Sequence, residues 1–159
     1  MMLENVVFEA IEIGQNASIV RSVKTSDVIG FAALTGDCNP IHLNEEYAKN
    51  TRFHGVVAHG MWTAAHISAL IGTRLPGPGS IYLSQELKFV APVMIGDTIT
   101  TKVTVIDKDF EHGVITLDCQ CTNQKKQEVV FGIATILAPK EKQYVDVNTP
   151  VIEAFDKIS

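Results

Sequence analysis

Hydrophobic and polar residues alternate in three stretches along the second half of the chain, and turn-forming residues separate these from each other and from a fourth, more apolar stretch. A period of two residues is typical of β-strands. The fourth stretch, 129–137, is apolar on both faces, which predicts a central or interface strand. The residues expected to share one face of a strand are Ile81, Leu83, Gln85, Leu87 and Phe89 in the first stretch, Ile99, Thr101, Val103 and Val105 in the second, and Ile115, Leu117, Cys119 and Cys121 in the third.

Shorter elements precede this β-rich half. Residues 16–23 predict one further strand. Thr25 or Ser26 is expected to cap a helix that stops at Gly36, because glycine commonly follows the last helical residue. Asn44 is expected to cap a short second helix.

The stretch 56–75 is apolar on nearly every side, which predicts a long buried helix. The Pro-Gly-Pro-Gly run at 76–79 ends it. Four consecutive strands after a group of helices indicate an α+β fold, with an antiparallel sheet and the helices on one side. Because the long helix has no polar face for water, the sheet is expected to wrap around it.

Length and composition fit one domain. The 159 residues include 46% hydrophobic and 19% charged residues, a surplus that indicates a buried subunit interface or a pocket for an apolar ligand. We assign residues 1–139 to a single domain and residues 140–159 to a polar tail. Pro150 suits the first position of a short helix in that tail.

Charge and cysteine content exclude several classes of protein. The net charge is −5 and the basic residues are scattered, so we expect no nucleic-acid partner. We expect no signal peptide, and no membrane span because His59, His66 and Arg74 interrupt the longest apolar stretch. Three cysteines, an odd number, are expected to be reduced thiols in a cytoplasmic protein. Cys38 is expected to be a buried small thiol rather than a nucleophile.

Asp37 and His42 are the first candidates for chemistry. They flank the stiff Asn39-Pro40 turn directly after the expected helix stop, so a carboxylate and an imidazole are held at a set separation. Such a pair can take a proton from one water and return it. The spacing fits equally well a structural turn, in which Asp37 caps the turn and His42 packs beneath it.

Gly60 and the remaining histidines complete the candidate list. A glycine N–H at the start of a buried helix can stabilise a negative oxygen, although close packing also explains a glycine there. His54 is expected in a loop, and His59 and His66 share one stripe of the long helix, as packing residues do. No metal is expected, because Asp37 and these histidines match none of the compact ligand spacings.

Three motifs carry a resemblance: "ALTGDCNPIHLNEEYA", "VVAHGM" and "LPGPGSIYLSQELKFVAPVMIGDTIT". Together they resemble the MaoC-like (R)-specific enoyl-CoA hydratases, over roughly residues 22–139. The resemblance implies the hot-dog fold, an antiparallel β-sheet wrapped around a long buried central α-helix. It also implies a homodimer or a dimer of dimers.

The resemblance places roles on particular residues. Asp37 and His42 take the places of the catalytic dyad, and Gly60 that of the oxyanion-hole glycine. The substrate-binding residues that it implies are Asn39, His59, Met61 and Ser68. It implies no cofactor and an acyl-CoA thioester substrate. An acyl-carrier-protein substrate fits less well, because the net charge of −5 opposes a strongly acidic carrier.

The implied reaction is the reversible hydration of trans-2-enoyl-CoA to (3R)-3-hydroxyacyl-CoA, in fatty-acid metabolism. Two alternatives stay open: a hot-dog acyl-CoA thioesterase, and an acyl-CoA-binding protein without activity. The acyl chain length is also open, as is the choice among Arg52, Arg74, Lys88 and Lys102 for contacts with the CoA phosphates.

Overall fold

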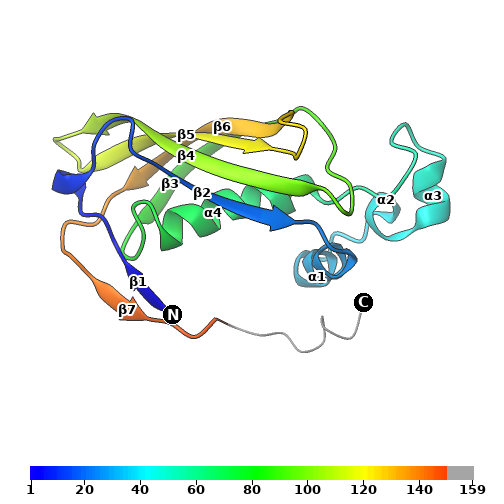
Figure 1. The fold of residues 1–159 in the computed structure, drawn as a ribbon, viewed down its shortest axis with the longest axis horizontal. Coiled ribbons are helices and arrows are strands. Elements are labelled where there is room, and N and C mark those ends of the chain that lie inside the picture. The colour runs from blue at the N-terminus through cyan, green and yellow to red at the C-terminus, as the bar shows by residue number, and fades with distance from the viewer. Residues whose placement is uncertain (150–159) are drawn as a thin grey trace.

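The computed structural model describes residues 1–149. A five-stranded antiparallel sheet, in the order β2-β4-β5-β6-β3, packs one face on helix α4 (Figure 1). The strands of this sheet are β2 (Asn16–Ser22), β3 (Ile81–Phe89), β4 (Thr98–Asp109), β5 (Val114–Thr122) and β6 (Glu128–Leu137). The helices are η1 (Phe8–Ala10, a 3-10 helix), α1 (Thr25–Thr35), α2 (Pro40–Leu43), α3 (Glu45–Lys49) and α4 (Gly60–Thr73). The predicted α+β class and antiparallel sheet are confirmed.

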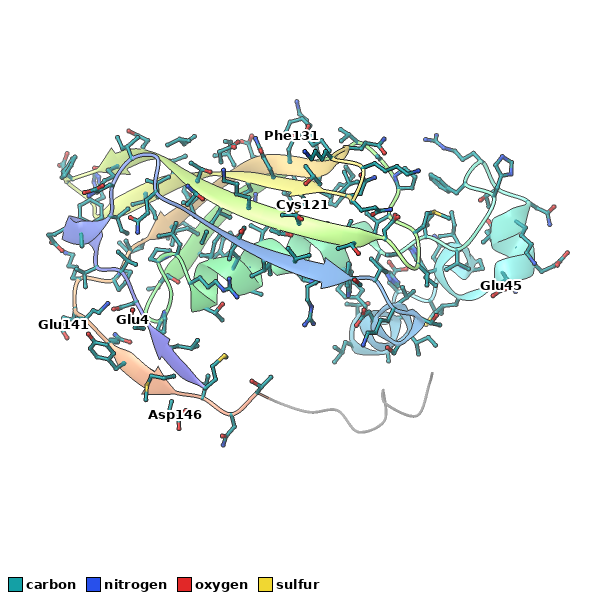
Figure 2. All side chains as sticks on the ribbon, in the orientation of Figure 1. Glu4, Glu45, Cys121, Phe131, Glu141 and Asp146 are labelled. Carbon is teal, nitrogen blue, oxygen red and sulfur yellow. The ribbon has the colours of Figure 1, made fainter. Side chains whose placement is uncertain are left out.

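The alternating residues of β4 and β5 build the core between sheet and helix. Ile99, Val103, Leu117 and Cys121 are fully buried. Cys121 lies on the side of the sheet that faces α4, whereas Phe131 of β6 lies on the other side (Figure 2). Burying one aliphatic side chain stabilises a fold by about 1.5–3 kcal/mol, so these alternate positions hold α4 against the sheet. Strand β6 lies between two neighbours, as its apolar sequence predicts.

Strand β3 departs from its predicted pattern. A β-bulge lies between Tyr82 and Ser84, and one extra residue moves the side chains before it to the other face. Tyr82 rather than Ile81 therefore shares a face with Gln85, and its hydroxyl donates a hydrogen bond to the Gln85 side chain. The prediction that Ile81 and Leu83 share the face of the later residues is wrong.

Helix α4 is shorter than predicted, and one of its faces is exposed rather than buried. It begins at Gly60 rather than at residue 56, because Val57 pairs with Met94 and the Ala58 N–H donates to the Val93 carbonyl at 2.8 Å. The sheet covers one face of the helix, not its whole circumference. The residues exposed on its other face are Met61, Ala65, Ser68, Ala69 and Gly72.

Helix α1 has a different cap from the one expected. Thr25 and Ser26 already lie inside the helix, and the Asp27 carboxylate accepts the Lys24 N–H at 2.9 Å. The predicted stop at Gly36 is confirmed: this residue has a φ of 77°, a conformation that glycine adopts without steric cost. The chain therefore leaves the helix sharply at this glycine.

The two ends of the described chain lie together. Strands β1 (Met2–Glu4) and β7 (Tyr144–Asp146) form a small antiparallel sheet apart from the main one (Figure 1). Part of the segment expected to be a polar tail, 140–159, is thus a strand. The short helix expected from Pro150 lies outside the described residues. No helix within residues 1–149 has the length and hydrophobicity needed to cross a membrane.

Candidate active site

The turn after α1 holds Asp37 at the surface. The Asp37 N–H donates to the Thr35 hydroxyl at 3.2 Å, and one Asp37 carboxylate oxygen accepts the Asn39 N–H at 3.3 Å. The Asn39 side chain caps α2 by accepting the Ile41 N–H at 3.2 Å, and Pro40 is the first residue of that helix. The predicted Asn-Pro turn therefore orders the chain between the two candidate catalytic groups.

His42, on α2, is anchored by a main-chain carbonyl. Its Nδ1 lies 2.7 Å from the Val57 oxygen. A carbonyl oxygen only accepts hydrogen bonds, so Nδ1 carries the hydrogen and Nε2 of the neutral ring keeps a free lone pair. The half-buried His42 ring can therefore take up a proton at Nε2 without losing its anchor.

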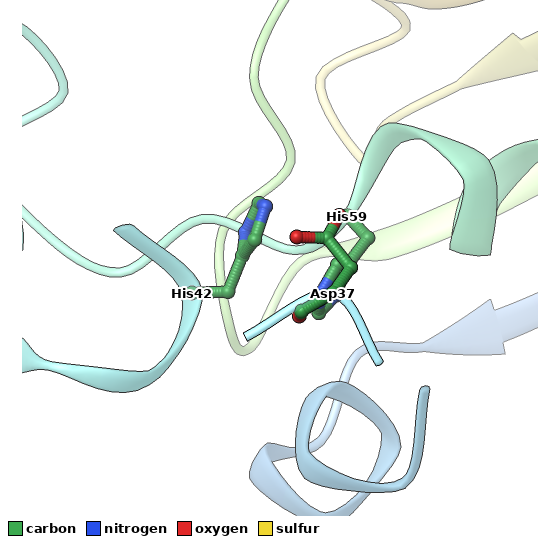
Figure 3. Close-up of side chains that lie close together, drawn as sticks. All are labelled: Asp37, His42 and His59. Atoms are coloured by element: carbon green, nitrogen blue, oxygen red, sulfur yellow. The ribbon is translucent and has the colours of Figure 1, made fainter. Parts of the chain in front are cut away.

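Asp37, His42 and the buried His59 form one cluster (Figure 3). A carboxylate oxygen of Asp37 and one ring nitrogen of each histidine all lie within 4.8 Å of one another. A tetrahedral water that makes two hydrogen bonds of about 2.8 Å separates its two partners by about 4.6 Å. The spacing of Asp37 and His42 therefore suits one shared water.

The same three residues raise the question of a metal. Ring lone pairs lie in the ring planes, and the planes of His42 and His59 are 28° apart with centroids separated by 3.8 Å. An ion about 2.1 Å from a nitrogen in one plane lies outside the other plane. The geometry of the stacked rings therefore disfavours ligation of one ion by both histidines.

Gly60 lines the same cavity as His42. It is the first residue of α4, where N–H groups have no helical partner, and its N–H has no other acceptor within residues 1–149. The cavity measures about 360 Å³, and its lining also includes Arg52, Thr63 and Phe89. A Cβ at Gly60 would lie 2.8 Å from the Phe89 ring, so a glycine lets that ring approach the helix start.

A family model described as a MaoC like domain matches residues 7–124. The chain belongs to the MaoC-like domain family. An (R)-specific enoyl-CoA hydratase from Rhodospirillum rubrum is 49% identical over 83% of this chain and 91% of that protein. A 3-hydroxybutyryl-CoA dehydratase from Methylorubrum extorquens is 45% identical over 86% of each chain.

Solved structures agree with the sequence comparison. An unliganded R-hydratase from Pseudomonas aeruginosa superposes with a TM-score of 0.91 and 40% identity, over 96% of this chain and 98% of that one. The hot-dog fold that the motifs implied is therefore confirmed for this MaoC-like domain.

The other predicted site residues of this MaoC-like domain are spread out. Asn39 supports the turn, and His59 is buried beneath His42. Met61 and Ser68 lie on the exposed face of α4, and neither lines the cavity of Gly60. Ser68 follows Gly60 by two helical turns, which is about 12 Å along the axis.

A second cavity, of about 400 Å³, lies beside His42 in this MaoC-like domain and is also bordered by α1 and by residues 54–56. His54 lines it, so the structure separates this histidine from Gly60. His42 borders both cavities. The sequence contained no signal for this second space, because its walls come from segments far apart in the chain.

The cysteines divide into two groups. Cys38 is exposed, so its predicted burial is wrong: the turn that presents Asp37 to solvent exposes its neighbour as well. Cys119 and Cys121 are buried free thiols, as predicted. Burial raises the pKa of Cys119 to about 12, so this thiol stays protonated and unreactive.

Proposed function

We propose that the protein catalyses the reversible hydration of trans-2-enoyl-CoA to (3R)-3-hydroxyacyl-CoA. The observation that carries this proposal is the Asp37–His42 pair: the two groups are close enough to share one water, and His42 lines the same cavity as Gly60. The likeness to hydratases and a dehydratase of enoyl-CoA chemistry supports it.

In the forward direction, the Asp37 carboxylate and His42 Nε2 hold one water. Its oxygen adds to C3 of the enoyl group, and the pair takes the proton that this oxygen loses. The electron pair of the double bond moves towards the thioester, and the resulting enolate oxygen accepts the Gly60 N–H. The pair then delivers a proton to C2. Acid–base help contributes about 10²–10⁴ in rate, and one oxyanion donor about 3–4 kcal/mol.

Arg52 is the basic residue best placed to meet a CoA phosphate. It lines the cavity of Gly60, whereas Arg74, Lys88 and Lys102 do not. Its guanidinium lies 5.1 Å from the Phe53 ring centre, and no carboxylate within residues 1–149 pairs with it. Among the four basic candidates, Arg52 is thus the one that lines this cavity and has no carboxylate partner within residues 1–149, which leaves it free to bind a CoA phosphate. The net charge of −5 makes a strongly acidic carrier protein a poorer partner.

We also propose a homodimer, or a dimer of dimers, in the cytoplasm, acting in fatty-acid metabolism. Three apolar side chains at the sheet edge, Ile81, Leu83 and Phe89, are each at least half exposed in the single chain. An exposed apolar edge strand tends to pair with a strand of another chain. Met61 and Ser68 stay candidates for substrate binding, from the open face of α4.

An enoyl-CoA hydration assay tests the proposal. Enoyl absorbance should fall without release of free thiol, and Asp37→Asn and His42→Gln should each lower kcat by about 10²–10⁴. Thiol release in place of absorbance loss would show a thioesterase. A wild-type protein that binds acyl-CoA but hydrates no enoyl chain length would be a binding protein, and full activity in both variants would remove these residues from the mechanism.

A further inference from the structure

His59 lies between the two catalytic candidates and the core. Its side chain is 2% exposed, and its ring stacks on His42 with centroids 3.8 Å apart. On another side, the ring of Phe31 from α1 lies 4.9 Å away at a tilt of 45°. Figure 3 shows the His59 ring beside both Asp37 and His42. A buried ring with aromatic neighbours on two sides has little freedom to move.

The hydrogen bonding of His59 sets its tautomer. Its Nε2 lies 3.0 Å from the main-chain oxygen of Asp37. Because that oxygen only accepts, Nε2 carries the hydrogen and Nδ1 is the unprotonated nitrogen. Nδ1 is buried and has no partner within residues 1–149. The imidazole therefore acts here as a hydrogen-bond donor to the Asp37 turn.

This hydrogen bond is the long-range anchor of an exposed turn. Residues 36–40 are all exposed. Their other hydrogen bonds within residues 1–149 join partners no more than four positions apart, whereas the bond from His59 spans 22 positions. Without His59, local bonds alone would hold the Asp37 carboxylate in place relative to His42.

We propose that His59 is a positioning residue, which holds the Asp37 turn through its Nε2–H and the His42 ring through its face. The proposal rests on the proposed function for its kinetic consequences, but its structural part does not. It gives His59 a role different from substrate contact: the residue sets the separation across which Asp37 and His42 share one water. A misplacement of about 1 Å in such a pair can lower the rate about 10²-fold.

Two substitutions separate the two contacts. His59→Phe keeps a buried aromatic ring against His42 but has no N–H for the Asp37 carbonyl. His59→Gln keeps an N–H close to the position of Nε2. We expect His59→Phe to lower kcat about 10–100-fold with KM changed less than about threefold, and His59→Gln to recover most of that kcat. His66→Phe, at the other buried histidine of α4, is the matched control and should leave kcat unchanged.

A double-mutant comparison tests whether His59 acts through Asp37. In an Asp37→Asn background, His59→Phe should lower kcat by less than about threefold, because the carboxylate that it positions is already gone. A raised KM with unchanged kcat would instead assign His59 to substrate contact and overturn the proposal. Equal losses in the Phe and Gln variants would also overturn it.

Hydrogen exchange keeps the test independent of activity. The amides of residues 36–39, 41 and 42 should exchange faster in His59→Phe than in the wild type, and at the wild-type rate in His59→Gln. If the wild type hydrates no enoyl-CoA, the proposed function fails and this exchange measurement alone decides the positioning role. Unchanged exchange in the Phe variant would refute it. His59→Leu takes the place of the Phe variant if the latter does not fold.

Discussion

Lowering the pH from neutral should destabilise the fold through His66. This histidine of α4 is 8% exposed, and its ring packs edge-on against Trp62 with centroids 4.2 Å apart. Burial, helped by the positive charge of Arg21, lowers the pKa of His66 from 6.5 to about 4, while Asp27 opposes the shift. The folded state therefore keeps this ring neutral at pH values where the unfolded chain binds a proton.

The sign and size of the effect follow from that difference. Between pH 6.5 and about 4 the unfolded state binds more protons, so stability falls as the pH falls, and it is fully present above pH 6.5. One pKa unit corresponds to about 1.4 kcal/mol. Across the whole window, this contribution to the free energy of unfolding therefore falls by about 3 kcal/mol. A change from about pH 7.5 to about pH 5 lowers it by about 2 kcal/mol.

Urea denaturation measures this contribution of His66 to the free energy of unfolding. The wild type and His66→Gln are compared at both pH values and at one protein concentration. Other groups titrate equally in both proteins, so the pH dependence of His66→Gln should be smaller by about 2 kcal/mol. His54→Asn, which removes an exposed loop histidine, should keep the wild-type dependence. Identical pH dependence in the wild type and His66→Gln would refute the argument that this ring is buried in its neutral form.

Three further substitutions test the site and the sheet. Gly60→Ala places a Cβ 2.8 Å from the Phe89 ring, so kcat for enoyl-CoA should fall about 10-fold or more, and Phe89→Leu in the same chain should restore part of it. Gly132→Ala places a Cβ 1.8 Å from the Glu86 carbonyl oxygen, which breaks the β3–β6 pairing and should cost about 4 kcal/mol or more in urea denaturation. Arg52→Gln should raise KM about tenfold for enoyl-CoA but not for an enoyl-pantetheine without phosphates.

Each of these three has an outcome that would count against it. If Gly60→Ala keeps the wild-type kcat, Gly60 does not contribute to stabilising the oxyanion. A Gly132→Ala protein within about 1 kcal/mol of wild-type stability would mean that β3 and β6 are not this close. An equal rise in KM for enoyl-CoA and enoyl-pantetheine would show that Arg52 does not bind a phosphate. Arg74→Gln is the matched control, since the Arg74 guanidinium donates to the Ser18 carbonyl.

The candidate site was predictable where local sequence sets the geometry. Gly36 ends α1 because a left-handed residue there favours glycine, and Asn39-Pro40 starts α2, so Asp37 and His42 had to lie on either side of a short turn. These constraints act over a few residues and need no partner from elsewhere in the chain. Their consequence, a carboxylate close to an imidazole, was therefore accessible from the sequence.

The role of His59 was not accessible in this way. Its partners are the carbonyl of Asp37 and the faces of Phe31 and His42, and they come together only when α1, α2 and α4 meet. Histidine at a helix start has no local pattern that distinguishes a packing residue from one that holds a distant turn. Long-range contacts decide between the two.

Sequence periodicity alone determined the class of the fold, since alternation in β4 and β5 requires strands with one buried face. The tertiary structure decided the rest: the bulge at Tyr82, the later start of α4 and the pairing of β1 with β7. Each of these depends on where another segment lies, because a strand partner, a facing carbonyl or a ring of Phe89 sets the available space. The local conformation of the backbone depends on neighbouring residues. Strand register, cavity shape and the stacking of two histidines arise only from the packing of residues that are distant in the chain.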